Sequence, residues 1–192
     1  THDGSGSIIA AFTPVRVVCN NTLNAALRNL SNVVKIKHTA NAKDRLKEAH
    51  KVMGMMNTLS PTLEGIFNQW SKVRITDAEV QELIKKAMSP TKEVLDRVIL
   101  GDYHELSTVF KNTCDRVFEY ASISPSQQLE TTKGTLFGAY NAITGYYQNV
   151  VNYKDETAKL KSIVYGGTAQ QRTQTAFKLC QDFMTFSDFI IN

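Results

Sequence analysis

Residues 7–18, with the sequence SIIAAFTPVRVV, carry the clearest strand pattern in the chain. Apolar and β-branched residues dominate this run, which is typical of an extended segment. A second run, VVKIKH at residues 33–38, alternates Val34 and Ile36 with two lysines. Between the runs, Asn20 to Thr22 can cap an amphipathic helix that reaches Leu30. The first 39 residues therefore predict a small β-α-β element.

After about Ala40 the spacing of apolar residues predicts helices to the end of the chain. Ser60-Pro61 either begins a new helix or kinks the preceding one. Thr76 and Glu79 have the spacing of a capping box. Gly101 can adopt the left-handed backbone conformation that ends an α-helix. Further apolar stripes predict helices with these residues on one face: Leu46, Ala49, Met53 and Met56; Val94, Leu95, Val98 and Ile99; Leu136, Tyr140, Ile143 and Tyr147; Ala176, Cys180 and Phe183.

These patterns predict an α+β fold in which the small N-terminal β-α-β element packs on a mostly helical bundle. We expect a single domain over residues 1–192, with a β-rich part at 1–39 and a helical part at 40–192. An isolated pair of strands is marginally stable in water. The chain is therefore expected to be the C-terminal part of a longer protein that supplies further strands.

Composition excludes several classes of protein. The 192 residues are 42% hydrophobic and 21% charged, which is ordinary for a globular domain. No apolar run approaches the roughly 20 residues that span a bilayer, and the start of the chain does not resemble a signal peptide. The three cysteines, Cys19, Cys114 and Cys180, are too widely spaced for a disulfide framework or a metal knuckle. We expect a cytoplasmic protein without cofactor, metal or membrane partner.

The positive charge lies at the beginning of the chain. Residues 1–53 hold eight lysines and arginines against three acids, a net charge of +5, whereas the remaining 14 basic and 15 acidic residues give −1. A basic surface attracts phosphates whatever the base sequence. Nucleic acid, either DNA or RNA, is therefore the first candidate partner.

The candidate phosphate ligands share a position on the predicted strands or at the start of the predicted helix. Asparagine and threonine at a helix N-terminus offer donors to an anion, and lysines on a ribbon can approach a nucleic-acid backbone. Each also has an ordinary structural explanation, such as a helix cap, an ion pair of Arg16 with Asp3, or a solvated surface. The candidate set is Arg16, Asn20, Asn21, Thr22, Lys35, Lys37 and His38.

Catalytic residues are harder to find. Cys19 precedes a predicted helix start, where the helix dipole favours a thiolate, and His2 or His38 could serve as its base. A lone cysteine after two valines is more often a small buried hydrophobic residue. His2, Asp3 and His38 could ligate a metal, but their spacing is not diagnostic. We therefore assign no catalytic residue and no metal ligand.

Three blocks of sequence resemble a known family. They are HDGS at residues 2–5 ahead of TPVRVVCNNTL at 13–23, then His38-Thr39, then GTLFGAYNAIT at 134–144. The chain resembles the later portion of the phage/plasmid-like conserved proteins, a family with a domain of unknown function. The resemblance implies a phage, prophage or plasmid gene product that acts in the bacterial cytoplasm. It implies no activity, substrate or catalytic residue.

The sequence favours a non-catalytic, nucleic-acid-binding accessory protein of mobile elements. One alternative is a protein-interaction or oligomeric scaffold protein of such elements, or a host-defence decoy, whose basic stretch is only solvated surface. In that case a homo-oligomer is the simplest assembly. A third alternative is a cysteine- or metal-dependent enzyme that uses Cys19 or His2.

Overall fold

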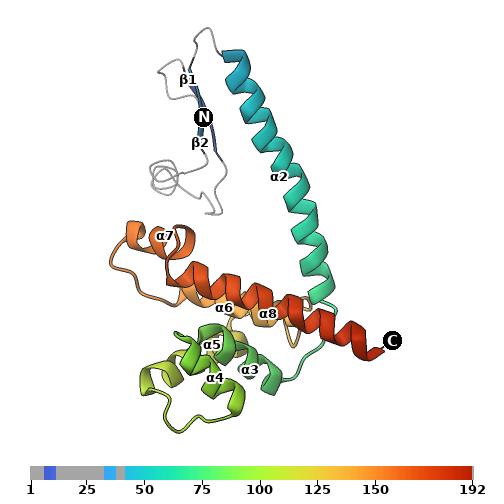
Figure 1. The fold of residues 1–192 in the computed structure, drawn as a ribbon, viewed down its shortest axis with the longest axis vertical. Helices are drawn as coiled ribbons and strands as arrows, with labels where there is room; N and C mark the ends of the chain where they lie inside the picture. Colours follow the sequence, from blue (N-terminus) through green and yellow to red (C-terminus); the bar gives the residue numbers. More distant parts are fainter. Residues whose placement is uncertain (1–6, 12–32, 38–41, 192) are drawn as a thin grey trace. The chain divides into compact units, whose positions relative to one another are not determined.

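The computed structural model describes residues 7–11, 33–37 and 42–191 of the chain (Figure 1). By its internal contacts the chain divides into two compact units, Thr1–Glu64 and Gly65–Asn192. Each unit is described by itself below. The expectation of a single domain over residues 1–192 stays a prediction.

The first unit contains a short ribbon and most of one long helix. Strand β1 (Ser7–Ala11) pairs with β2 (Val33–Lys37) in antiparallel register, with Ile8 opposite Ile36. The predicted helix between them lies outside the described residues. Helix α2 (Ala42–Trp70) continues through Pro61 without a break. Pro61 therefore begins no new helix.

The predicted α+β fold class is wrong, because the described part of the chain is helical apart from ten residues in β1 and β2. The two strands pair with each other, and the described residues add no third strand to them. Strands were predicted at residues 7–18 and 33–38, and they are confirmed at Ser7–Ala11 and Val33–Lys37; residues 12–18 and 38 lie outside the described residues. Strand propensity does not reveal whether neighbouring strands exist. The four apolar stripes named above lie in α2, α4 (Lys92–Leu100), α6 (Leu136–Asn149) and α8 (Thr168–Ile191), and the buried residues come from helices and their connections.

The second unit holds the end of α2 and six further α-helices, α3 to α8. Local signals begin and end several of them. Thr76 and Glu79 form the predicted capping box at the start of α3, and Gly101, at φ 74°, ends α4 as predicted. None of the predicted apolar stripes falls in α7, where Asp155 caps the N-terminus. The bounds are α3 (Asp77–Met88), α4 (Lys92–Leu100), α5 (Thr108–Ile123), the 3-10 turn η1 (Pro125–Gln127), α6 (Leu136–Asn149), α7 (Glu156–Val164) and α8 (Thr168–Ile191).

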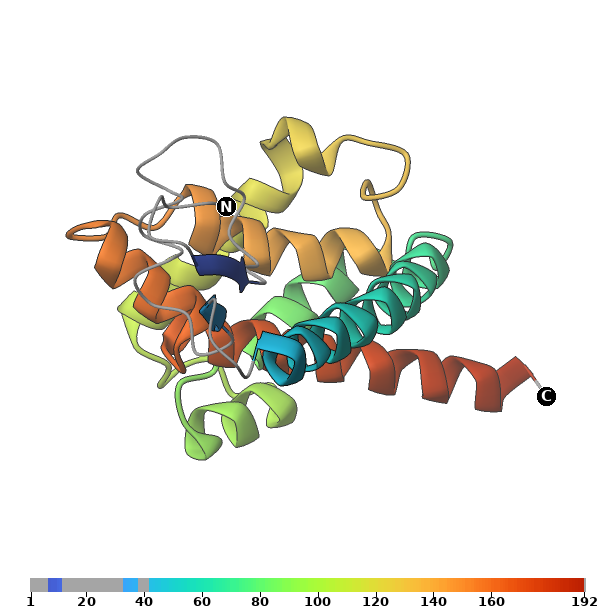
Figure 2. The ribbon, with the colours of Figure 1, turned by 90° about the horizontal axis from the view of Figure 1, so that it is seen from above.

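Helix α6 is central to this unit, because it packs against α3, α5 and α8. Helix α8 also contacts α3 and α7, and Figure 2 shows α7 beside the start of α8. Leu136 and Ile143 of α6 have no exposed surface. An aromatic cluster joins the end of α2 to α6 and α8, and its members are Phe67, Trp70, Phe137, Tyr140 and Phe177. Trp70 is buried and Phe67 is half-buried, so contacts among these rings hold the end of α2 against α6 and α8.

Candidate functional site

Most of the predicted phosphate ligands lie outside the described residues. This holds for Arg16, Asn20, Asn21, Thr22 and His38, as it does for His2, Asp3 and Cys19. The other two predicted ligands, Lys35 and Lys37, lie in β2, where their backbones pair with Ile9 and Ser7. The assignment of these seven residues to a nucleic-acid site stays a prediction.

The described part of the first unit adds a basic helix face. Lys43, Lys47 and His50 of α2 are all exposed, and their spacing of four and three residues places them on one side of the helix. Among the α2 residues whose side chains the structure describes, the neighbours in the same stripe are Leu46 and Gly54, both exposed. This stripe is missing from the predicted ligand set, although its spacing is visible in the sequence.

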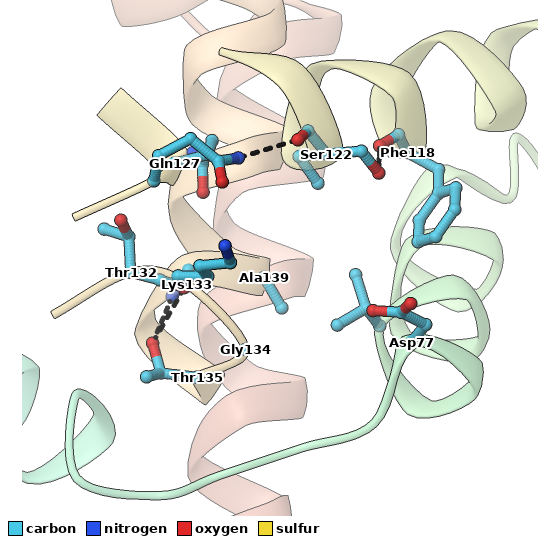
Figure 3. A pocket seen from close by; sticks show the side chains of 13 residues that line it. Asp77, Phe118, Ser122, Gln127, Thr132, Lys133, Gly134, Thr135 and Ala139 are labelled. Atoms are coloured by element: carbon cyan, nitrogen blue, oxygen red, sulfur yellow. Dashed lines mark hydrogen bonds between the residues drawn. The ribbon is translucent and has the colours of Figure 1, made fainter. Parts of the chain in front are cut away.

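A pocket of about 250 Å³ opens in the second unit between α3, α5, η1 and the start of α6 (Figure 3). Its apolar wall includes Val80, Phe118 and Ala121. Figure 3 shows Asp77 and Phe118 on one side, across from Thr132 and Lys133. The remaining lining residues are Ser122, Gln127, Gln128, Gly134, Thr135, Gly138 and Ala139.

One wall of the pocket is held by a clamp between two connecting segments. The Ile75 amide donates to the Gly134 carbonyl at 3.1 Å, and the Leu136 amide donates to the Val73 carbonyl at 2.9 Å. The Arg74 guanidinium adds a hydrogen bond to the Lys133 carbonyl at 2.8 Å. These bonds satisfy backbone groups that have no partner within a helix, including the first amide of α6, and they fix the chain that precedes α6.

The N-terminus of α6 carries a buried polar cluster. Thr135 accepts a hydrogen bond from the Gly138 amide at 3.0 Å and donates to the Thr131 carbonyl at 2.8 Å. Thr132 donates to the Ser126 carbonyl at 2.9 Å. The Gln127 amide, oriented as its neighbours favour, donates to the Gly138 carbonyl at 3.1 Å. The buried polar groups at this end of α6 are thus satisfied by hydrogen bonds.

The pocket suits binding better than chemistry. Its lining includes one carboxylate, Asp77, and one ammonium group, Lys133, but neither an imidazole nor a thiol. The Ser122 hydroxyl donates to the Phe118 carbonyl at 2.9 Å, so its proton is already engaged within the helix. A nucleophile needs a neighbouring base that can take its proton. Asp77 and Lys133 lie on opposite sides of the pocket (Figure 3), so its lining carries one group of each charge.

The two described cysteines are not reactive thiolates. Burial raises the pKa of Cys180 to about 12, and burial followed by the nearby Asp115 carboxylate raises the pKa of Cys114 to about 12. Each therefore behaves as a small apolar residue of the core at neutral pH.

Neither a metal site nor a membrane-spanning helix is present among the described residues. No group of three or more histidine, cysteine or acidic side chains converges to hold a metal ion among residues 42–191 and the two strands. No helix in the same part of the chain combines the length and the apolar character needed to cross a membrane.

Comparison with known proteins gives one match. The model of a protein family described as a domain of unknown function (DUF932) matches residues 1–164. No curated protein and no solved structure matches the chain. The matched range includes both the basic N-terminal quarter and the pocket, and the third block of the family resemblance, residues 134–144, supplies four of the pocket's lining residues.

Proposed function

We propose that this chain, which belongs to the DUF932 family, is a non-catalytic protein that binds nucleic acid through its basic first quarter. The observation that supports the proposal best is the exposed basic face of α2, formed by Lys43, Lys47 and His50. In keeping with the resemblance described above, we propose that it acts as an accessory protein of phages or plasmids in the bacterial cytoplasm.

The physical argument rests on charge and geometry. Residues 1–53 carry a net charge of +5, while the rest of the chain is close to neutral. Lys43 and Lys47 are separated by about 6 Å along the helix axis, since each residue of an α-helix rises roughly 1.5 Å. A row of cations can contact successive phosphates and release the counterions bound to them. Such binding is insensitive to base sequence and sensitive to salt.

Fluorescence anisotropy of labelled single- and double-stranded DNA and RNA tests the proposal, with salt varied from low to physiological concentration. We expect an affinity that falls steeply with salt. Lys47→Glu should weaken binding of every sequence about equally and reduce the slope of log K against log salt by about one. The paired change Lys35→Glu with Lys37→Glu should have a larger effect.

The control variants carry the same change of charge on the second unit. Lys92→Glu matches the single variant, and Lys92→Glu with Lys154→Glu matches the pair, because both lysines are exposed. Equal losses in the variants and their controls would show that only net charge matters. Flat anisotropy at every salt concentration would overturn the proposal.

A further inference from the structure

Helix α2 carries an apolar seam with the period of a coiled coil. Apolar or small residues recur at alternating intervals of three and four from Leu46 to Trp70, which are the a and d positions of a heptad repeat. In this register the a positions are Leu46, Met53, Ser60 and Phe67, and the d positions are Ala49, Met56, Leu63 and Trp70.

The two ends of the seam have different surroundings. Trp70 is only 2% exposed, and both Phe67 and Trp70 belong to the aromatic cluster of the second unit. Leu46 is 59% exposed and Leu63 is 40% exposed. At the end of α2, this side of the helix packs in the core of the second unit through Trp70. Closer to the start of α2, the same side presents Leu46 and Leu63 to water. Burial of one leucine side chain is worth about 1.5–3 kcal/mol.

We propose that α2 of a second copy of this chain covers the seam, in an antiparallel two-helix coiled coil. Leu46 of each copy then packs against Leu63 of the other. A heptad seam selects another helix as its partner, because a and d side chains insert between the side chains of a facing helix. The contact involves α2 residues 43–64, which belong to the first unit.

Charge decides both the partner and the orientation. Lys43 and Glu64 occupy e positions, and e positions of antiparallel helices flank the seam on the same side. With Leu46 level with Leu63 of the second copy, Lys43 lies beside the partner helix at Glu64. In a parallel pair, g and e positions meet instead, so that Arg45 would lie near His50 of the other copy and two basic residues would face each other.

The charges needed for the antiparallel pair are available. Lys43 and Glu64 are both exposed, and neither has an ion pair with another described residue. Lys47 occupies a b position, away from the seam, so the dimer leaves this lysine on the surface. The inference does not depend on nucleic-acid binding, since it rests on apolar spacing and on the pairing of Lys43 with Glu64; Lys43 alone is shared with the basic face.

Sedimentation velocity over a range of protein concentrations tests the assembly. We expect a reversible dimer, whose dissociation constant rises roughly tenfold or more in Leu46→Glu and in Leu63→Glu, because each change places a charge in an apolar seam. The matched control is Leu100→Glu, since Leu100 of α4 is 82% exposed and lies in the second unit. The control should dimerise normally, and circular dichroism should show equal helix content in all three.

Charge exchange identifies the partner as a second copy. Lys43→Glu and Glu64→Lys should each weaken the dimer, and the variant that carries both should recover it, because the opposite charges then meet again in reversed positions. Failure of the double variant to recover would overturn the assigned pairing. A wild-type protein that stays monomeric at every concentration would overturn the dimer and show that the seam is covered in another way.

Cysteine cross-linking tests the orientation in a Cys19→Ala background, where the other cysteines, Cys114 and Cys180, are buried. Leu46→Cys mixed with Leu63→Cys should form a disulfide-linked dimer under mild oxidation, and neither variant alone should do so. Efficient cross-linking of Leu46→Cys alone would show a parallel pair and overturn the antiparallel arrangement.

Discussion

Gly138 lies so close to the backbone of Thr132 that a Cβ atom on residue 138 would stand 1.8 Å from the Thr132 carbonyl oxygen. The obstacle is backbone that is itself held by hydrogen bonds, so it cannot move aside as a flexible side chain would. We expect Gly138→Ala to destabilise the protein by about 1–3 kcal/mol or more, as overpacking does. The midpoint of urea unfolding measures the loss.

Gly65→Ala is the matched control, because Gly65 lies within α2 with no atom near its would-be Cβ. Alanine favours a helix interior over glycine by roughly 0.5–1 kcal/mol. We therefore expect Gly65→Ala to raise the free energy of unfolding and Gly138→Ala to lower it. Equal stability of Gly138→Ala and the wild type would contradict the close contact with Thr132.

The capping box of α3 should make stability depend on acid pH. Backbone and side-chain hydrogen bonds from Thr76 lower the pKa of Glu79 from its ordinary value of 4.5. A lowered folded-state pKa contributes stability above the unfolded pKa, and this contribution is lost as the pH falls through the folded pKa. Thr76→Ala should cost about 1 kcal/mol near neutral pH. Thermal melts of both proteins should differ less at pH 3 than at pH 7.

Cys114 and Cys180 should resist thiol reagents in the folded protein. Burial raises both pKa values to about 12, so at pH 8 almost no thiolate is present and the sulfur atoms are covered. In a Cys19→Ala background we expect no labelling by a chromogenic disulfide reagent before denaturation, and two thiols per chain after it. Rapid labelling of the native protein would contradict the burial and reopen a thiol role.

Arg172 of α8 should contribute to stability through the end of α3. Its guanidinium donates to the Ser89 carbonyl at 2.5 Å, and Ser89 is buried at the C-terminus of α3. A cation also complements the partial negative charge of a helix C-terminus. Arg172→Met should cost about 1–3 kcal/mol, because a buried carbonyl loses a charged partner. Lys178→Met, which removes an exposed cation from the same helix, should change the unfolding midpoint little.

Local signals in the sequence predicted local structure well. The capping box at Thr76 and the stop at Gly101 depend on a few adjacent residues, and both are present as predicted. Asp155 has the same character as an N-cap, yet the nine-residue helix after it was not predicted, because its apolar stripe is short. Helix caps and stops can thus be recognised in the sequence. The helix between them is predicted only when it is long enough to show the apolar period of a helix.

Features that depend on distant residues were not predictable in the same way. Two predicted strand segments, which overlap β1 and β2, led to a wrong fold class, since the number of strands in a sheet is a property of the whole chain. The pocket combines Asp77, Phe118 and Lys133, which only the packing of α3, α5 and α6 brings together. A hint existed in residues 134–144, where the block used for the family resemblance lines that pocket.

The clamp between residues 73–75 and 132–136 has a consequence for how the second unit comes apart. The amides of Ile75 and Leu136 bond to carbonyls that are far away in sequence, so neither bond survives once the intervening helices separate. Hydrogen exchange at most connecting segments reports local fraying, whereas core elements exchange only through large openings. Although Ile75 lies in a connecting segment and Leu136 is only the first residue of α6, these two amides should exchange as slowly as the core of α6. The rate of deuterium uptake at both amides would then report the global opening of the unit.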